Sequence, residues 1–278
     1  MTIPSVALND GNTLPAVGFG TVSLRGEDGI TAMVNALEAG YRLLDTAVNY
    51  ENEVEVGEAV RRSGLSRNEV QIATKVPGRH HQYDLCIRSV EDSLKRLRSN
   101  YVDLVHIHWP NPSVGLYVEA WRALVDLRER GLIRSVGVSN FTEQHLAAVI
   151  DDSGVTPAVN QIEMHPLFPQ EEMRAVHRRL GVVTEAWSPL AKRNAPYDAE
   201  PITAAARAHD VTPAQVILRW HLQLGSLPIP KSSNPERQRT NLDLFSFELT
   251  ADEVAAISGL ARPDGRLFGG DPDRHEEM

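Results

Sequence analysis

The sequence has a single cysteine, Cys86, so no disulfide bond can form within the chain. A lone thiol suits a reducing compartment, and we therefore expect a cytoplasmic protein. No hydrophobic run approaches the roughly 18 residues that cross a bilayer. The first residues, Met1 to Ser5, show neither the basic nor the apolar region of a signal peptide. We therefore expect no membrane partner.

Lysine is also scarce: of 28 lysines and arginines, only Lys75, Lys95, Lys192 and Lys231 are lysines. Acidic residues outnumber the basic ones, and the formal net charge is -9 at pH 7. A protein field of that sign repels nucleic acids and anionic surfaces, so we expect no nucleic-acid partner. No apolar stripe is left without a covering segment, which favours a monomer.

Short apolar runs typical of strands alternate with segments of helical periodicity. Asn9-Asp10-Gly11 predicts a β-hairpin turn near the N-terminus. Eight strand-like runs follow it: Val17–Gly20, Arg42–Asp45, Val70–Lys75, Val102–His108, Ile133–Ser139, Ala158–Ile162, Val182–Trp187 and Leu227–Lys231. Regular alternation of strand and helix predicts parallel strands.

Eight such units in 278 residues predict an α/β fold, a (β/α)8 TIM barrel with an N-terminal β-hairpin. Gly40 predicts the end of the first helix, and Thr212 and Thr250 each predict a helix start with a capping box. No linker divides the chain, so we expect one domain over residues 1–278. The segment from Arg262 to Met278 is rich in glycine, aspartate and arginine, and predicts a surface loop that leaves the site open.

Polar residues lie where several of these strands end, and the active sites of such barrels lie at that end. Asp45 closes the second run, Lys75 the third and His108 the fourth, and Tyr50 lies in the loop after Asp45. A phenol has a pKa near 10, which a neighbouring ammonium lowers, while a carboxylate anchors the ammonium. This set suits proton delivery to an oxygen that gains negative charge, as in carbonyl reduction.

Each of these residues also has an ordinary structural explanation. Asp45 and Lys75 can form a structural ion pair, and Ser139 and Asn140 can cap the next helix. His106 and His165 are expected to be structural histidines, and Gly18-Phe19-Gly20 lacks the third glycine of a dinucleotide-binding motif. All of these polar residues are expected at the same rim of one barrel, and this shared location favours the catalytic interpretation.

Six segments together resemble the aldo-keto reductases, in order and across nearly the whole chain. They are Leu44 to Glu53, Thr74-Lys75, His108-Trp109-Pro110, Gly137 to Phe141, Asn160 to Glu163 and Ile229 to Ser232. Together with the chain length, the segment Glu185-Ala186-Trp187 makes the sequence most similar to the bacterial 2,5-diketo-D-gluconate reductase group.

The resemblance implies that Tyr50 is the proton donor, that Lys75 and Asp45 tune it, and that His108 orients the carbonyl. It also implies NADPH as cofactor and no metal. The implied cofactor-binding residues are Thr21, Asp45, Ser139, Asn140, Gln161, Trp187, Ser188, Leu190, Lys231, Ser232, Arg237 and Asn241. Trp187 stands where many relatives have tyrosine, and its flat ring keeps a surface for stacking the nicotinamide.

The segment from Lys231 to Arg237 predicts a phosphate site independently of the family. A helix that starts near Asn234 with a lysine and an arginine beside it favours an anion. The resemblance assigns Lys231, Ser232 and Arg237 to the 2′-phosphate of NADP, while Thr240 departs from the glutamate or glutamine of many relatives. None of the three positions that the resemblance assigns to the phosphate carries an acidic residue, which would bind a bare ribose there, and this favours NADPH over NADH.

The predicted small-molecule substrate is a carbonyl compound: 2,5-diketo-D-gluconate, a methylglyoxal-like dicarbonyl or an aromatic aldehyde. Val22, Val48, Asn49, His108 and Trp109 are the candidates to line its pocket. Two other functions stay open from the sequence alone. One is a barrel that binds NADP(H) as a redox sensor or regulatory subunit. The other is a metal-dependent hydrolase, which lacks the support of an H-x-H pair at the end of the first strand or of a carboxylate cluster; His106 and His108 alternate on the fourth strand.

Overall fold

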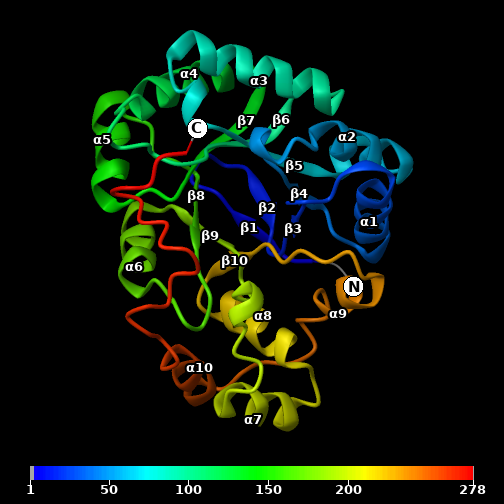
Figure 1. The fold of residues 1–278 in the computed structure, drawn as a ribbon. Helices are drawn as coiled ribbons and strands as arrows, with labels where there is room; N and C mark the ends of the chain where they lie inside the picture. Colours follow the sequence, from blue (N-terminus) through cyan, green and yellow to red (C-terminus); the bar gives the residue numbers. More distant parts are fainter. Residues whose placement is uncertain (1–2, 278) are drawn as a thin grey trace.

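The computed structural model describes residues 3–277, and its centre is an eight-stranded parallel sheet (Figure 1). The strands follow one another in the sheet in chain order. They are β3 (Phe19–Gly20), β4 (Leu43–Asp45), β5 (Gln71–Val76), β6 (Val102–Ile107), β7 (Ile133–Ser139), β8 (Val159–Glu163), β9 (Val183–Trp187) and β10 (Ser226–Pro228). Gly18 N donates to Pro228 O and Gly20 N to Pro230 O, which joins the first strand to the last. The predicted (β/α)8 barrel is confirmed.

Helices connect consecutive strands and surround the sheet (Figure 1). They are α1 (Gly26–Ala39), α2 (Glu53–Arg62), α3 (Tyr83–Leu97), α4 (Tyr117–Glu129), α5 (Glu143–Ser153), α6 (Glu171–Leu180), α7 (Glu200–His209), α8 (Pro213–Gln223), α9 (Pro235–Thr240) and α10 (Ala251–Ser258). Single 3-10 turns are η1 (Val48–Tyr50), η2 (Arg67–Glu69), η3 (Gly78–His80) and η4 (Lys192–Asn194). Two helices, α7 and α8, lie between β9 and β10, where a plain repeat has one.

The predicted helix ends are confirmed. Gly40 follows α1 with φ of 117°, the left-handed region that glycine enters without strain. Thr212 and Thr250 accept from the backbone three residues on, and Gln215 and Glu253 complete both capping boxes. The side chain of Asn234 caps α9 by accepting from Glu236 N and Arg237 N. Local side-chain chemistry therefore sets these boundaries.

The N-terminal hairpin pairs β1 (Ser5–Ala7) with β2 (Thr13–Pro15) in antiparallel register. Leu8 and Leu14 of this hairpin are buried in one cluster with the strand residues Leu43, Ala73 and Leu104. The hairpin therefore covers the amino-terminal end of the barrel with apolar side chains. No helix of the described residues has the length and apolar composition to cross a membrane.

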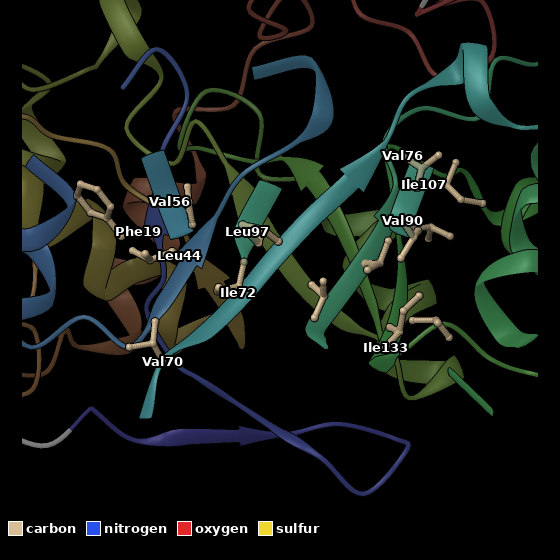
Figure 2. Packing of buried hydrophobic residues seen from close by; sticks show 14 of the residues in the cluster. Phe19, Leu44, Val56, Val70, Ile72, Val76, Val90, Leu97, Ile107 and Ile133 are labelled. Atoms are coloured by element: carbon tan, nitrogen blue, oxygen red, sulfur yellow. The ribbon is translucent and has the colours of Figure 1, made fainter. Parts of the chain in front are cut away.

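Alternation along the strands separates two layers of side chains. Leu44, Ile72 and Ile107 point to the surrounding helices, where they pack with helical residues such as Val56, Val90 and Leu97 (Figure 2). Leu43, Ala73 and Leu104, which have the opposite parity on the same three strands, point into the barrel instead. Two positions beyond these three, the same inward face carries Asp45, Lys75 and His106. The period of the strands thus places polar groups inside the carboxyl end of the barrel.

The tail after α10 (residues 262–277) contains no helix or strand among its described residues, as predicted, but it contacts the rim of the barrel. In Figure 1 this segment, in red, runs from α10 back to the C-terminus. Leu267 N donates to Glu163 Oε1 at 2.7 Å, and the ring of Phe268 stacks on that of Trp187. Phe268 is the described tail residue that lines the cavity, a contact that the sequence did not suggest, while the expectation of an open site stays a prediction.

Candidate active site

A cavity of about 360 Å³ lies at the carboxyl end of the strands. It is where a TIM barrel carries its active site. Of the residues predicted from the sequence, those that line it are Thr21, Val22, Asp45, Tyr50, His108, Trp109, Ser139, Asn140, Gln161, Trp187, Ser188, Leu190 and Lys231. The fold thus brings residues from seven separate strand ends to one cavity.

Asp45 and Lys75 form a buried ion pair beneath the cavity. Lys75 Nζ lies 2.7 Å from Asp45 Oδ1 and 2.8 Å from Oδ2, and it donates a third bond to Thr46 O at 2.9 Å. The Lys75 side chain is fully buried. Buried charges are tolerated where they are paired and hydrogen-bonded, and all three ammonium hydrogens have acceptors here. The two residues therefore share one field, as the sequence predicts.

Tyr50 ends η1 and lies directly above this pair, with Lys75 Nζ 5.1 Å from the centre of its ring. Burial raises the pKa of Tyr50; Lys75 lowers it by charge and a hydrogen bond, and the Asp45 carboxylate raises it again. Lys75 thus lowers the pKa of the phenol, as expected, but burial raises the same pKa by more, and the net direction is upward. Desolvation of a phenolate outweighs the ammonium. The phenol accordingly keeps its proton at neutral pH.

His108 follows β6 and meets Tyr50 edge to face, with ring centres 5.9 Å apart. Its backbone is fixed on both sides, since His108 N donates to Val76 O and Asn140 Nδ2 donates to His108 O. Its Nδ1 lies 2.8 Å from Oε1 of Glu277 in the C-terminal tail. Glu277 could not be predicted from the sequence, because 169 positions separate it from His108 and no local pattern links the two residues.

The four residues predicted around the nicotinamide are tied to one another. Ser139 Oγ donates to Gln161 O, Asn140 Nδ2 donates to Ser139 Oγ, and Trp187 Nε1 donates to Asn140 Oδ1 at 2.8 Å. The alternative that Ser139 and Asn140 cap the next helix is wrong, because Thr142 caps α5. Asn140 has φ of 60°, a strained value that turns its side chain back to the strand ends.

Gln161 connects the ion pair to a second buried carboxyl group. Its Nε2 donates to Asp45 Oδ1 at 2.8 Å and to Glu185 Oε2 at 2.7 Å, which uses both amide hydrogens. Burial, aided by the Asp45 charge, raises the pKa of Glu185 to about 8. Gln161 Oε1 is left as an acceptor at the cavity, where an amide such as a carboxamide can donate to it.

His106 lies fully buried beside Glu185, with Nε2 3.5 Å from Glu185 Oε2. Burial and the Lys75 charge hold the pKa of His106 well below its ordinary value, so the ring is neutral. Asp45, His106 and Glu185 bring their polar atoms within 4.8 Å of one another, a carboxylate cluster that the sequence did not suggest. The Lys75 ammonium, in contact with Asp45, already supplies the positive charge of this cluster.

His165 is structural in the sense predicted. It is buried, and its Nε2 lies 3.0 Å from Glu163 Oε1, below the rim. The ring also lies near Phe168, with centres 6.4 Å apart. His165 does not line the cavity described above.

The predicted phosphate residues lie at one end of the cavity. Lys231 lines it and is exposed, whereas Ser232, Arg237 and Asn241 lie beyond the lining. Ser232 and Arg237 flank the start of α9, and Asn241 follows its end, buried. These positions fit an extended ligand that leaves the cavity toward α9, with two cations for a phosphate.

The predicted substrate residues divide into two groups. Val22, His108 and Trp109 line the cavity, but Val48 and Asn49 do not. The amide of Asn49 is instead engaged outward, donating to Glu277 Oε1 and accepting from Arg79. Phe268 and Lys192 line the cavity without having been predicted for it. Their contribution depends on how the tail and the η4 turn fold back, which no short motif encodes.

Comparison with known proteins places the chain in the class that this site suggests. The profile of the Aldo/keto reductase family matches residues 16–262, and the chain belongs to that family. The 2,5-diketo-D-gluconic acid reductase B of Corynebacterium sp. is 56% identical over 276 residues, covering 99% of both chains. An aldo-keto reductase of Mycolicibacterium vanbaalenii is 50% identical over 277 residues, covering 98% of this chain and 97% of its own. The family predicted from the motifs is confirmed.

Solved structures agree with this assignment. A mutant of Gox0644 in complex with NADPH has a TM-score of 0.94 at 40% identity, covering 99% of this chain and 100% of its own. The Bombyx mori aldo-keto reductase in complex with NADP has a TM-score of 0.90 at 34% identity, covering 99% of this chain and 98% of its own.

Proposed function

We propose that this aldo-keto reductase uses NADPH to reduce the carbonyl group of small aldehydes and ketones to alcohols. The observation that carries the proposal is the stack of Asp45, Lys75 and Tyr50 beneath one cavity, with His108 at its side. When bound, NADPH supplies the hydride. The remaining chemistry, delivery of a proton to the carbonyl oxygen, falls to this chain.

Tyr50 is the proposed proton donor. Its phenol is protonated at neutral pH because burial raises its pKa, so a proton is present when the oxygen gains negative charge. Lys75, held by Asp45, then stabilises the phenolate that is left, since the ammonium favours the charged form. His108 orients the carbonyl oxygen from the side of the cavity. Water from the mouth can return the proton to Tyr50.

The cofactor site is proposed from the donors and acceptors present. Gln161 Oε1 and Ser139, together with Asn140, suit a carboxamide, and Trp187 offers a flat ring for the nicotinamide. Thr21, Ser188 and Leu190 line the path between the two ends. Lys231, Ser232 and Arg237 suit the 2′-phosphate, and Asn241 lies toward the adenine. None of Lys231, Ser232 and Arg237 is acidic, and the one acidic residue beside them, the exposed Glu236 in the first turn of α9, is outnumbered by the two cations.

The substrate class is proposed from the relative and from the cavity. The Corynebacterium relative is named for 2,5-diketo-D-gluconic acid, and the cavity of about 360 Å³ holds both the proposed nicotinamide residues and the proposed substrate contacts. Methylglyoxal-like dicarbonyls and aromatic aldehydes fit the same chemistry. Val22, Trp109 and Phe268 are the proposed contacts. A monomeric, single-domain, cytoplasmic enzyme stays a prediction from the sequence.

Replacement of Tyr50 by phenylalanine tests the mechanism. Turnover of a dicarbonyl is measured as the loss of NADPH absorbance, with NADH assayed in parallel. It should fall about 100- to 10,000-fold in the variant, the usual contribution of a positioned acid. NADPH affinity, measured by fluorescence quenching, should stay near that of the parent.

Parent-like turnover in Tyr50→Phe would show that another group donates the proton. If the parent protein binds NADPH but reduces no member of a carbonyl panel, the chain is a redox sensor instead.

A further inference from the structure

The end of the C-terminal tail is built into the wall of the active site. Glu277 Oε1 accepts from Asn49 Nδ2 at 2.8 Å and lies 2.8 Å from His108 Nδ1. Glu277 N donates to Asn111 Oδ1, and Asn111 Nδ2 donates back to Glu277 O. The Glu277 side chain is only 14% exposed. Both the backbone and the side chain of Glu277 therefore have specific contacts with the barrel.

The surrounding chain is shaped to admit this residue. A Cβ atom added to Gly78 would lie 2.2 Å from Glu277 O, so only glycine lets the tail approach so closely. Glu276 Oε1 accepts from Ser113 N at 2.8 Å, and the His275 ring lies 4.1 Å from that of Trp109. Three successive tail residues therefore dock on the loop after β6, the loop that carries His108.

The Glu277 carboxyl group is ionised in this position beside His108 and Asn49. Burial opposes its ionisation, but the contacts with His108 and Asn49 outweigh burial and hold the pKa of Glu277 below its ordinary value. An ionised carboxylate accepts hydrogen bonds and donates none. His108 Nδ1 lies 2.8 Å from this carboxylate at an angle outside that of a regular hydrogen bond, and it has no other hydrogen-bond partner among the described residues. Two lone pairs would repel each other at that distance, so we expect Nδ1 to be the ring nitrogen that carries the hydrogen.

The position of Glu277 relative to the cavity separates two roles. The described residues that line the cavity include Tyr50, His108 and Trp109, but not Glu277. The carboxylate thus approaches His108 from behind and leaves the cavity open, which argues against a plug that competes with substrate. With Nδ1 engaged, Nε2 is the ring nitrogen left for the cavity.

We propose that Glu277 is a positioning residue for carbonyl reduction, whose carboxylate holds His108 Nδ1–H and so keeps Nε2 turned toward the bound carbonyl oxygen. This inference rests on the proposed function for its consequence, although not for its geometry. Nε2 donates to the oxygen when the ring carries both hydrogens, and Glu277 is then the counter-ion of that ring. In other histidine sites a carboxylate likewise orients the imidazole by accepting a hydrogen bond from one ring nitrogen.

Nitrogen NMR of isotopically labelled histidine tests the geometry without any substrate. The His108 signals are identified by their absence in a His108→Gln variant. In the parent, His108 Nδ1 should show the shift of a protonated nitrogen; in Glu277→Ala it should move toward the unprotonated shift. The matched control is Glu276→Gln, which removes a neighbouring tail charge, keeps an oxygen for Ser113 N and leaves His108 untouched.

Kinetics test the consequence on the same proteins. For Glu277→Ala, kcat/KM for a dicarbonyl should fall about 10- to 100-fold, the worth of a charge-assisted hydrogen bond, with NADPH affinity unchanged; Glu276→Gln should match the parent. An unprotonated His108 Nδ1 in the parent, or parent-like kinetics in Glu277→Ala, would overturn the inference. Absence of any turnover in the parent, with Nδ1 protonated, would instead refute the proposed function alone.

Discussion

Burial and neighbouring charges act in opposite directions on the pKa of Tyr50. Burial raises the pKa of its phenol, while the Lys75 ammonium lowers it and the Asp45 carboxylate raises it again. Burial is the largest of these effects, so the resting side chain is a neutral acid. In the proposed mechanism Lys75 acts after proton transfer, when it faces a phenolate rather than a phenol. The sequence predicted the effect of the ammonium on the pKa of Tyr50 but not the larger effect of burial, because burial depth cannot be inferred from a loop residue alone.

Glu185 provides a stability prediction at the same scale. Burial raises its pKa to about 8, whereas an unfolded chain has an ordinary glutamate, whose pKa is 4.5. Between these values the folded protein holds one proton more than the unfolded chain, so Glu185 stabilises the fold below pH 4.5, and this contribution is lost as pH rises through about 8. In the Glu185→Gln variant this loss is absent, because an amide does not titrate and can still accept from Gln161.

Urea unfolding of the parent and of Glu185→Gln across this pH interval measures the effect. The free energy of unfolding of the variant, relative to the parent, should rise with pH by at most about 1.4 kcal/mol per pH unit. Other titrating groups are common to both proteins and cancel in the difference. A difference that is flat with pH would mean that Glu185 is ionised throughout.

At the scale of whole elements, regular alternation made the barrel predictable. Strand β7 has the predicted bounds, β6 ends one residue earlier than predicted, and β5 is shifted by one residue at both ends. The last strand is shorter than predicted, ending at Pro228 rather than Lys231, because the proline at 230 has no N–H to donate to a ladder. Contacts between distant segments were not predictable: the Glu277–His108 contact and the Glu185–Gln161 bond join residues that no local period relates.

The packing of α2 on α3 gives a prediction for an element pair. A Cβ atom at Gly57 in α2 would lie 2.5 Å from Leu97 O at the end of α3. Alanine favours a helix over glycine by roughly 0.5–1 kcal/mol, but moving backbone in a packed interface costs about 1–3 kcal/mol. Gly57→Ala should therefore lower the free energy of unfolding, measured in urea. Equal or greater stability would show that α2 and α3 can separate freely.

The whole molecule couples its stability to the cofactor. A ligand that binds only the folded barrel stabilises it, by about 2.7 kcal/mol at a concentration 100 times its Kd. If Lys231 and Arg237 hold the 2′-phosphate, NADPH should raise the thermal midpoint more than an equal concentration of NADH. Arg237→Ala should shrink the shift for NADPH and leave that for NADH unchanged, because only the former has the phosphate.

Arg239 is the matched control for this measurement. It lies on the same helix, α9, and is exposed like Arg237, but it lines a separate surface depression with Ala39 and Leu242. Arg239→Ala removes the same charge from α9 without approaching the cavity, so its NADPH shift should equal that of the parent. Equal losses in both variants would reduce the role of Arg237 to a general attraction between α9 and an anion. If only Arg237→Ala loses part of the NADPH-induced shift in the thermal midpoint, the Arg237 guanidinium contributes to the preference of the protein for NADPH over NADH.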